Sequence, residues 1–180
     1  MGKAIGVIEF RSIGKGIEAT DAMTKRADVQ IIDNRMICIG KYFVIVTGEV
    51  AALQDAMDEG EYIAGDTLIG SKLIASVADG VLEKINAKFD SSDIDALGIF
   101  ETKDLSSGIY GANYIKKSSN VELLKISLTL GLGGKAIVLF TGDVASVNSA
   151  LEVAKEKVSP EKVVSAINIP SPSKELITNL

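Results

Sequence analysis

The sequence of 180 residues contains no histidine and no tryptophan, and it has only one cysteine and three prolines. Without histidine, the chain lacks the usual general base near neutral pH and the commonest metal ligand. A single cysteine cannot build a disulfide framework within the chain, which fits the cytosol. Since no nucleophile–base pair can be named among the other residues, we expect a protein that is not an enzyme.

The sequence also lacks a surplus of positive charge and long apolar runs. Its net charge is -5, which argues against nucleic acid as a partner because no basic surplus is available to displace phosphate counterions. Apolar runs such as residues 136–142 are too short to cross a bilayer, and the first ten residues lack the apolar core of a signal peptide. We therefore expect a cytoplasmic protein without a membrane partner.

The sequence repeats itself. Residues 4–9 (AIGVIE) return as residues 96–101 (ALGIFE), at an offset of 92. Later the offset becomes 94, because residues 40–44 (GKYFV) match residues 134–138 (GKAIV). The change of offset marks a two-residue difference in length near Cys38. Two copies of about 90 residues are too few and too long for a solenoid repeat, so we predict a duplicated globular domain.

The repeat and the composition predict the domain limits. We expect a first domain over residues 1–88, a second over residues 94–170 and an extended C-terminal tail over residues 171–180. The link between the copies is expected at the polar stretch 86–95, and two of the three prolines, Pro170 and Pro172, flank the start of the tail.

Each copy is expected to be mixed α/β (α+β). In the first copy we predict strands at 4–10, 29–37, 41–47 and 68–77, with helices at 13–26 and directly after residues 47–49. In the second copy, apolar residues at 144, 147, 151, 154 and 158 predict a core-facing helix, and residues 162–169 predict the last strand. The uncharged runs 42–46 and 136–140 indicate strands buried on both faces. This order is close to a ferredoxin-like plan.

The repeated motifs resemble a known family. Residues 4–9, a helix with Gly16 and Asp21, residues 25–29 (KRADV) and residues 47–51 (TGEVA) are together similar to the bacterial microcompartment shell domain. The resemblance covers both copies. It implies two tandem ferredoxin-like shell domains, a homotrimer of pseudohexameric shape, a structural role in the microcompartment shell and other shell proteins as partners.

Within this family, the chain is similar to the tandem shell proteins of propanediol-utilisation microcompartments that carry an iron–sulfur cluster. The resemblance implies one cluster per trimer, of the 4Fe–4S type, bound by Cys38 from three subunits. The cluster would pass electrons across the shell to a redox enzyme partner or be delivered to an enclosed enzyme. The resemblance also implies shell-edge contacts by Lys25 and Lys117, and a pore loop of Ile37, Ile39, Gly40, Gly131, Leu132, Gly133 and Gly134. The chain departs from this pattern at Ile39, where those proteins have proline.

The residues by themselves leave other interpretations of Cys38 open. A lone cysteine in an apolar stretch is more often a small buried hydrophobic residue. Only symmetry could supply several thiolates, and zinc with three thiolates and water would fit the same donors. A shell tile with a metabolite-conducting pore and no cofactor, and a duplicated ferredoxin-like module that binds a small regulatory ligand, remain alternatives. The glycine-rich segment 131–135 (GLGGK) lacks the spacing of a phosphate-binding loop.

Overall fold

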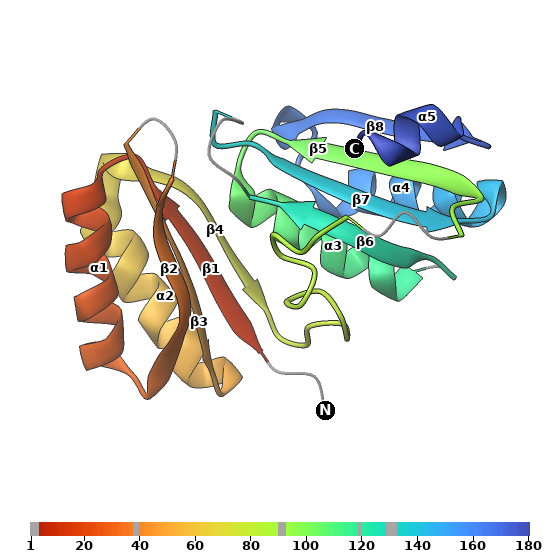
Figure 1. The fold of residues 1–180 in the computed structure, drawn as a ribbon. Coiled ribbons are helices and arrows are strands. Elements are labelled where there is room, and N and C mark those ends of the chain that lie inside the picture. The colour runs from red at the N-terminus through yellow and green to blue at the C-terminus, as the bar shows by residue number, and fades with distance from the viewer. Residues whose placement is uncertain (1–3, 38–39, 90–92, 119, 129–132) are drawn as a thin grey trace. The chain divides into compact units, whose positions relative to one another are not determined.

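The computed structural model describes residues 4–37, 40–89, 93–118, 120–128 and 133–180. These residues contain two four-stranded antiparallel sheets (Figure 1). The chain divides into two compact units. The first comprises Met1–Val77, Asp104–Ser106 and Thr129–Gly134, and the second comprises Ala78–Lys103, Ser107–Leu128 and Lys135–Leu180.

The first sheet and its helices come from the first sequence copy. In chain order the elements are β1 (Ile5–Phe10), α1 (Ile13–Arg26), β2 (Val29–Ile37), β3 (Lys41–Gly48), α2 (Val50–Ala64), a 3-10 turn (Gly65–Thr67) and β4 (Leu68–Ile74). The strand order is β2-β3-β1-β4, and α1 and α2 lie on the same face of the sheet (Figure 1). The predicted order of strands and helices is confirmed.

Helix α1 begins at a favourable capping residue. The Ser12 side chain accepts a hydrogen bond from the N–H of Lys15 at 3.3 Å, which satisfies one of the donors that a helix leaves unpaired at its start. Its last turn contains Lys25 and Arg26, whose positive charge complements the carbonyl end of the helix. Between these ends, Gly16, Ala19 and Met23 recur at helical spacing and are buried.

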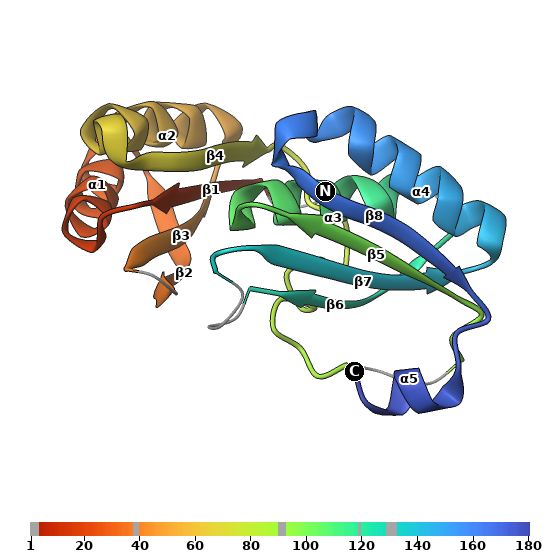
Figure 2. The ribbon, with the colours of Figure 1, turned by 90° about the horizontal axis from the view of Figure 1, so that it is seen from above.

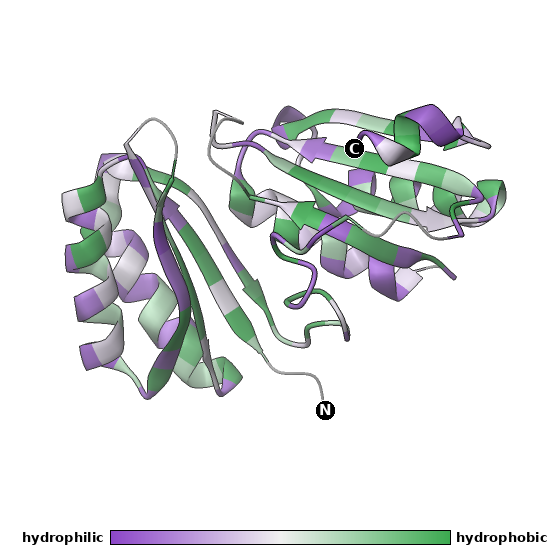
Figure 3. Ribbon diagram, viewed as in Figure 1, coloured by the Kyte–Doolittle hydropathy of each residue, from purple (hydrophilic) through white to green (hydrophobic). Residues whose placement is uncertain are grey.

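The core of the first unit lies between this sheet and its two helices. Residues 42–46 of β3 are all buried, so the predicted burial of this strand on both faces is confirmed. Its alternate residues Tyr42, Val44 and Val46 join a cluster with Met23 of α1 and Leu53 of α2. Figure 3 shows the resulting concentration of hydrophobic residues in the central strands of both sheets.

The second sheet and its helices come from the second copy. The elements are β5 (Ala96–Thr102), α3 (Leu105–Ser118), β6 (Glu122–Ser127), β7 (Ala136–Gly142), α4 (Val144–Lys157), a 3-10 turn (Pro160–Lys162) and β8 (Val163–Pro170). The strand order β6-β7-β5-β8 repeats that of the first sheet. The predicted buried stripe on α4 is confirmed at Val147, Leu151, Ala154 and Val158, whereas Val144 is exposed because it lies at the first position of the helix.

One tertiary hydrogen bond recurs in both copies. The Thr47 hydroxyl donates to the carbonyl of Ala4 at 2.8 Å, and the Thr141 hydroxyl donates to the carbonyl of Ala96 at 2.9 Å. Each threonine lies at the end of a central strand, where it ties that strand to the start of its neighbour. The sequence repeat is therefore also a repeat of specific tertiary contacts.

The C-terminal segment forms a short helix, so its prediction as an extended tail was wrong. Helix α5 (Lys174–Thr178) follows Ser173, whose side chain accepts a hydrogen bond from the N–H of Leu176 at 3.2 Å. Ile177 is buried in a cluster with Leu97, Leu124 and Leu139. Helix α5 and helix α4 lie on opposite faces of the second sheet (Figure 2). The burial of Ile177, which the sequence pattern did not reveal, holds the segment against the sheet.

Candidate functional site

The segment that contains the predicted cofactor residue joins two paired strands of the first sheet. Ile37 ends β2 and is paired with Lys41, the first residue of β3. Three residues join them, and of these Cys38 and Ile39 lie outside the described residues. Gly40 is exposed and has a φ of +68°, in the left-handed region that favours glycine. Gly40 therefore suits a tight reversal of the chain beside Cys38.

The equivalent connection in the second copy is longer. Strand β6 ends at Ser127 and β7 begins at Ala136, and Gly131 and Leu132 lie outside the described residues. Gly133 and Gly134 have φ values of +63° and +77°. A side chain at Gly134 would also collide with the amine of Lys41. Both described glycines of this predicted loop therefore have backbone conformations that other residues rarely adopt.

A buried ion pair lies at the beginning of β3. Lys41 Nζ is 3.2 Å from Glu9 Oε1, and the Glu9 side chain is fully buried. The other carboxylate oxygen, Oε2, accepts the N–H of Leu105 at 2.8 Å. Burial raises the pKa of Glu9, and the Leu105 N–H and the Lys41 charge partly offset this rise. Since both of its oxygens have partners, this carboxylate has a structural role.

The second copy repeats this ion pair in a more open environment. Lys135 Nζ is 2.9 Å from Glu101 Oε1, and the two side chains are 45% and 22% exposed. The Ser165 hydroxyl donates to Glu101 Oε2 at 3.2 Å. Sequence reasoning did not select either pair. The signal was present, because each glutamate ends the first repeated motif and each lysine follows the glycine of the second.

The two lysines predicted at the shell edge occupy equivalent helix ends. Lys25 is exposed in the last turn of α1, and its Nζ lies 2.6 Å from Asp21 Oδ2. Lys117 is exposed in the last turn of α3. The position equivalent to Asp21 is Asn113, which is buried and accepts the N–H of Ala78 at 2.8 Å. The two lysines therefore have different local surroundings.

The described part of one chain contains no cluster of three or more His, Cys, Asp or Glu residues that could hold a metal ion. The whole sequence has one cysteine and no histidine. A site built on thiolates therefore requires more than one copy of the chain. None of the helices in the described ranges is long and apolar enough to span a membrane.

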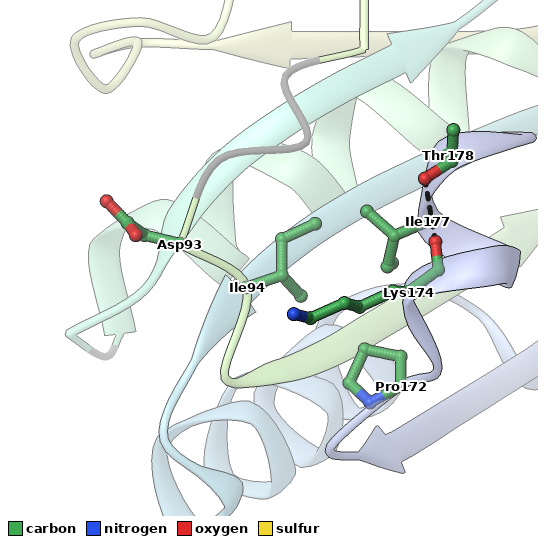
Figure 4. A pocket seen from close by; sticks show the side chains of 6 residues that line it. All are labelled: Asp93, Ile94, Pro172, Lys174, Ile177 and Thr178. Atoms are coloured by element: carbon green, nitrogen blue, oxygen red, sulfur yellow. Dashed lines mark hydrogen bonds between the residues drawn. The ribbon is translucent and has the colours of Figure 1, made fainter.

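An open pocket of about 350 Å³ lies beside helix α5. Ile94, Pro172 and Ile177 form its apolar wall, the Lys174 side chain extends toward Ile94, and Asp93 points away from the others (Figure 4). The dashed line in that view is the bond from the Thr178 hydroxyl to the carbonyl of Lys174, 2.8 Å long. These residues pack the helix against the sheet, and none forms a nucleophile–base pair.

Comparison with known proteins identifies the family. Residues 4–77 and residues 96–172 each match the BMC domain. The chain belongs to the BMC domain family. It is 38% identical over 156 residues to the bacterial microcompartment shell protein PduT of Citrobacter freundii, a match that covers 87% of this chain and 85% of that protein. It is also 38% identical over 79 residues to the major carboxysome shell protein CsoS1A of Halothiobacillus neapolitanus, which covers 42% of this chain and 81% of that protein.

Solved structures support the tandem arrangement. A crystal structure of a microcompartment protein from Desulfitobacterium hafniense has a TM-score of 0.81 and 37% identity, and the match covers 98% of both chains. A fused permuted hexameric shell protein of the RMM microcompartment has a TM-score of 0.64 over 87% of this chain and 81% of that chain, at 22% identity, which shows the fold alone.

These matches confirm the predicted family and the fold of two BMC domains. They show a structural protein of a bacterial microcompartment shell, as predicted, and proteins of this family assemble with other shell proteins.

Proposed function

We propose that this shell protein forms a homotrimeric tile in which six BMC domains surround one axis, with the β2–β3 connections facing that axis. The observation that carries this proposal is the duplication, because a chain with two equivalent domains builds a ring of six from three copies. A heterologous contact repeated around a closed ring gives such a cyclic assembly.

The edge of the first sheet supports association with another chain. Strand β2 is outermost in its sheet, and Ile31, Ile32 and Met36 are exposed on it, Met36 to 62%. An open strand edge with apolar side chains favours pairing or packing with a second chain, and exposed apolar groups often mark interaction surfaces. We infer that another copy of the chain covers this edge.

We further propose that Cys38 from three subunits binds one iron–sulfur cluster of the 4Fe–4S type on the axis. Clusters of this type are usually held by four thiolates. Three chains supply three, so the fourth iron would take water, a small thiol or a group from a partner. The donors fit this cofactor only in a symmetric assembly, since the sequence offers no second cysteine and no histidine.

The chain's own residues would position the cluster and close the pore. Ile37 is buried at the end of β2 and its pairing with Lys41 fixes the base of the connection. Gly40 permits the reversal that turns the chain back toward β3. A bound cluster would supply one-electron chemistry, with electron transfer across the shell or delivery of the cluster to an enclosed enzyme as its use.

Anaerobic purification of the wild type and of Cys38→Ser tests the cluster. We expect iron and acid-labile sulfide at one cluster per trimer in the wild type, with a low-temperature EPR signal after reduction, and neither in the variant. Sedimentation velocity on both proteins should show a trimer. Zinc in place of iron and sulfide would contradict the cluster and indicate a zinc site on the same three thiolates. A metal-free wild type after reconstitution would favour a tile with a metabolite-conducting pore.

We also propose that Lys25 and Lys117 contact neighbouring tiles at the edge of the trimer. Their exposure at equivalent helix ends supports this role. We expect the double variant Lys25→Ala, Lys117→Ala to remain a trimer but to form fewer extended sheets in electron micrographs. Lys15→Ala, at another exposed position of α1, serves as the control. Undiminished sheets in the double variant would contradict the edge role.

A further inference from the structure

The glutamates at equivalent positions of β1 and β5 differ in one hydrogen bond. Glu9 and Glu101 are 92 positions apart, and each binds a lysine, at 3.2 Å and 2.9 Å. Glu9 also accepts the N–H of Leu105, the first residue of α3. Within the described residues, the other hydrogen bond of the Glu101 carboxylate comes from the Ser165 hydroxyl. The second glutamate therefore lacks the helix contact that the first one makes.

The same offset of 92 positions identifies the helix start that corresponds to the start of α3. The residue 92 positions before Leu105 is Ile13, the first residue of α1. Neither α1 nor α3 has an acidic residue in its first turn. Helix starts have unpaired N–H groups and a partial positive charge. The buried Asp104 directly precedes α3, where Ser12 precedes α1, and Glu9 adds a second carboxylate that accepts the first N–H of α3. Within the described residues, no hydrogen bond brings a carboxylate to the start of α1.

We propose that the Glu101 carboxylate accepts the N–H of Ile13 from a second copy of this chain. This inference rests on the proposed trimer. In a ring of six similar domains, each equivalent surface makes the same contact with the next domain, so a bond made within one chain at Glu9 is made between chains at Glu101. Each trimer would contain three such bonds, one at each junction between subunits.

The surroundings of Glu101 fit a partner that a single chain does not contain. The Glu9 and Lys41 side chains are 0% and 16% exposed, while Glu101 and Lys135 are 22% and 45% exposed. An ionised carboxylate can accept about four hydrogen bonds, and Lys135 and Ser165 use two. The second pair thus has both the exposed surface and the acceptor capacity that a neighbouring helix start would occupy.

One substitution removes the proposed donor with little disturbance of helix α1. Proline is favoured at the first helical position because its missing N–H is unpaired within the helix there. The residue before a proline must be extended, and Ser12 has φ -114° and ψ 125°. Ile13→Pro therefore deletes the donor, and Ile13→Ala is the control that shortens the side chain but keeps the N–H.

The acceptor has its own pair of variants. Glu101→Ala removes the carboxylate, while Lys135→Met breaks the ion pair and keeps the acceptor. Sedimentation equilibrium over a range of concentrations measures assembly, and circular dichroism checks the fold. Relative to the matched controls, we expect Ile13→Pro and Glu101→Ala each to raise the concentration for half-assembly at least tenfold, because charged hydrogen bonds are the stronger class.

The double variant Ile13→Pro, Glu101→Ala decides whether the two groups form one contact. If they do, the combined loss of assembly is no greater than either single loss, because the first substitution has already removed the bond. Losses that multiply in the double variant, or a trimer unaffected by both single substitutions, would overturn the contact while leaving the trimer intact. A wild-type chain that stays monomeric would overturn the trimer and this contact together.

Discussion

The outer strands β2 and β6 occupy equivalent places in the two sheets but have different surroundings. On β2, Ile31, Ile32 and Met36 are exposed, whereas Leu123 and Ile126 of β6 are buried. The linker between the two BMC domains, described over residues 78–89, accounts for part of the difference. Ile85 forms a parallel bridge with Ile126, so the linker runs along the outer edge of β6. The same domain fold therefore occurs here with an open strand edge and with a covered one.

Hydrogen bonds hold the linker along the outer edge of β6. The Asn86 N–H donates to the carbonyl of Ile126 at 2.7 Å, and the N–H of Ile126 donates to Lys84 at 2.8 Å. The Asn86 side chain also accepts the N–H of Leu128 at 2.8 Å. A covered edge cannot accept another strand. The linker therefore covers the outer edge of β6, and no comparable segment covers β2 within the described residues.

The largest expected effect tests whether the two cores are packed differently around equivalent glycines. A methyl group at Gly6 would meet the flexible Met57 side chain, but one at Gly98 would meet the buried Phe140 ring. Because methionine adapts and an aromatic ring does not, we expect Gly98→Ala to lower the free energy of unfolding by about 3 kcal/mol and Gly6→Ala by about 1 kcal/mol. Urea denaturation measures both. Equal losses would show that the cores adjust equally.

A substitution of Asn86, which has a φ of +53°, should weaken the contact between the linker and β6. Asn86→Gly suits this backbone conformation and removes the acceptor for the N–H of Leu128. We therefore expect the free energy of unfolding to fall by about 1 kcal/mol, and the amide of Leu128 to exchange hydrogen faster. Asn86→Asp keeps an acceptor and is the control. Unchanged exchange at Leu128 in the glycine variant would show that the side chain does not hold the linker.

Burial of Glu9 predicts a pH dependence of stability. Because burial raises the pKa of Glu9 above its ordinary value of 4.5, the folded protein binds more protons than the unfolded chain in this range. Stability should therefore fall as pH rises from about 4.5 through the folded pKa. We expect Glu9→Gln to flatten this slope in urea denaturation midpoints, with Glu101→Gln as the control at the equivalent position. A slope that survives Glu9→Gln would assign it to another group.

The smallest expected effect compares the starts of α2 and α4. Asp143 accepts the N–H of Ser146 at 2.8 Å, whereas Glu49 makes no such bond with its side chain. We expect Asp143→Ala to lower the melting temperature slightly and Glu49→Ala to leave it unchanged. The Ser146 N–H holds the pKa of Asp143 below its usual 3.8. The stabilisation is thus present above that value and is lost as pH falls through the folded pKa. A melting temperature that responds equally to both substitutions would contradict the cap.

Several elements were predictable because their signals are local. Strand β2 and helix α1 have the predicted bounds, because strand-forming residues and helical spacing act within a few residues. Helix α5 was missed because a segment of five residues with one buried apolar residue gives only a weak helical pattern. The Glu9 and Glu101 pairs were also missed, since each joins residues more than 30 positions apart. Cys38 lies outside the described residues, so its role stays a prediction.

By itself, the sequence determined that two similar α/β domains follow one another and that they belong to a shell protein family, because repeated motifs and residue periodicity are written along the chain. Tertiary structure decided which edge strand is covered, which glutamate is buried and which helix start receives a carboxylate. Those outcomes depend on neighbours brought together by folding. Two similar local motifs, such as those that contain Glu9 and Glu101, therefore acquire different environments that the repeat alone does not predict.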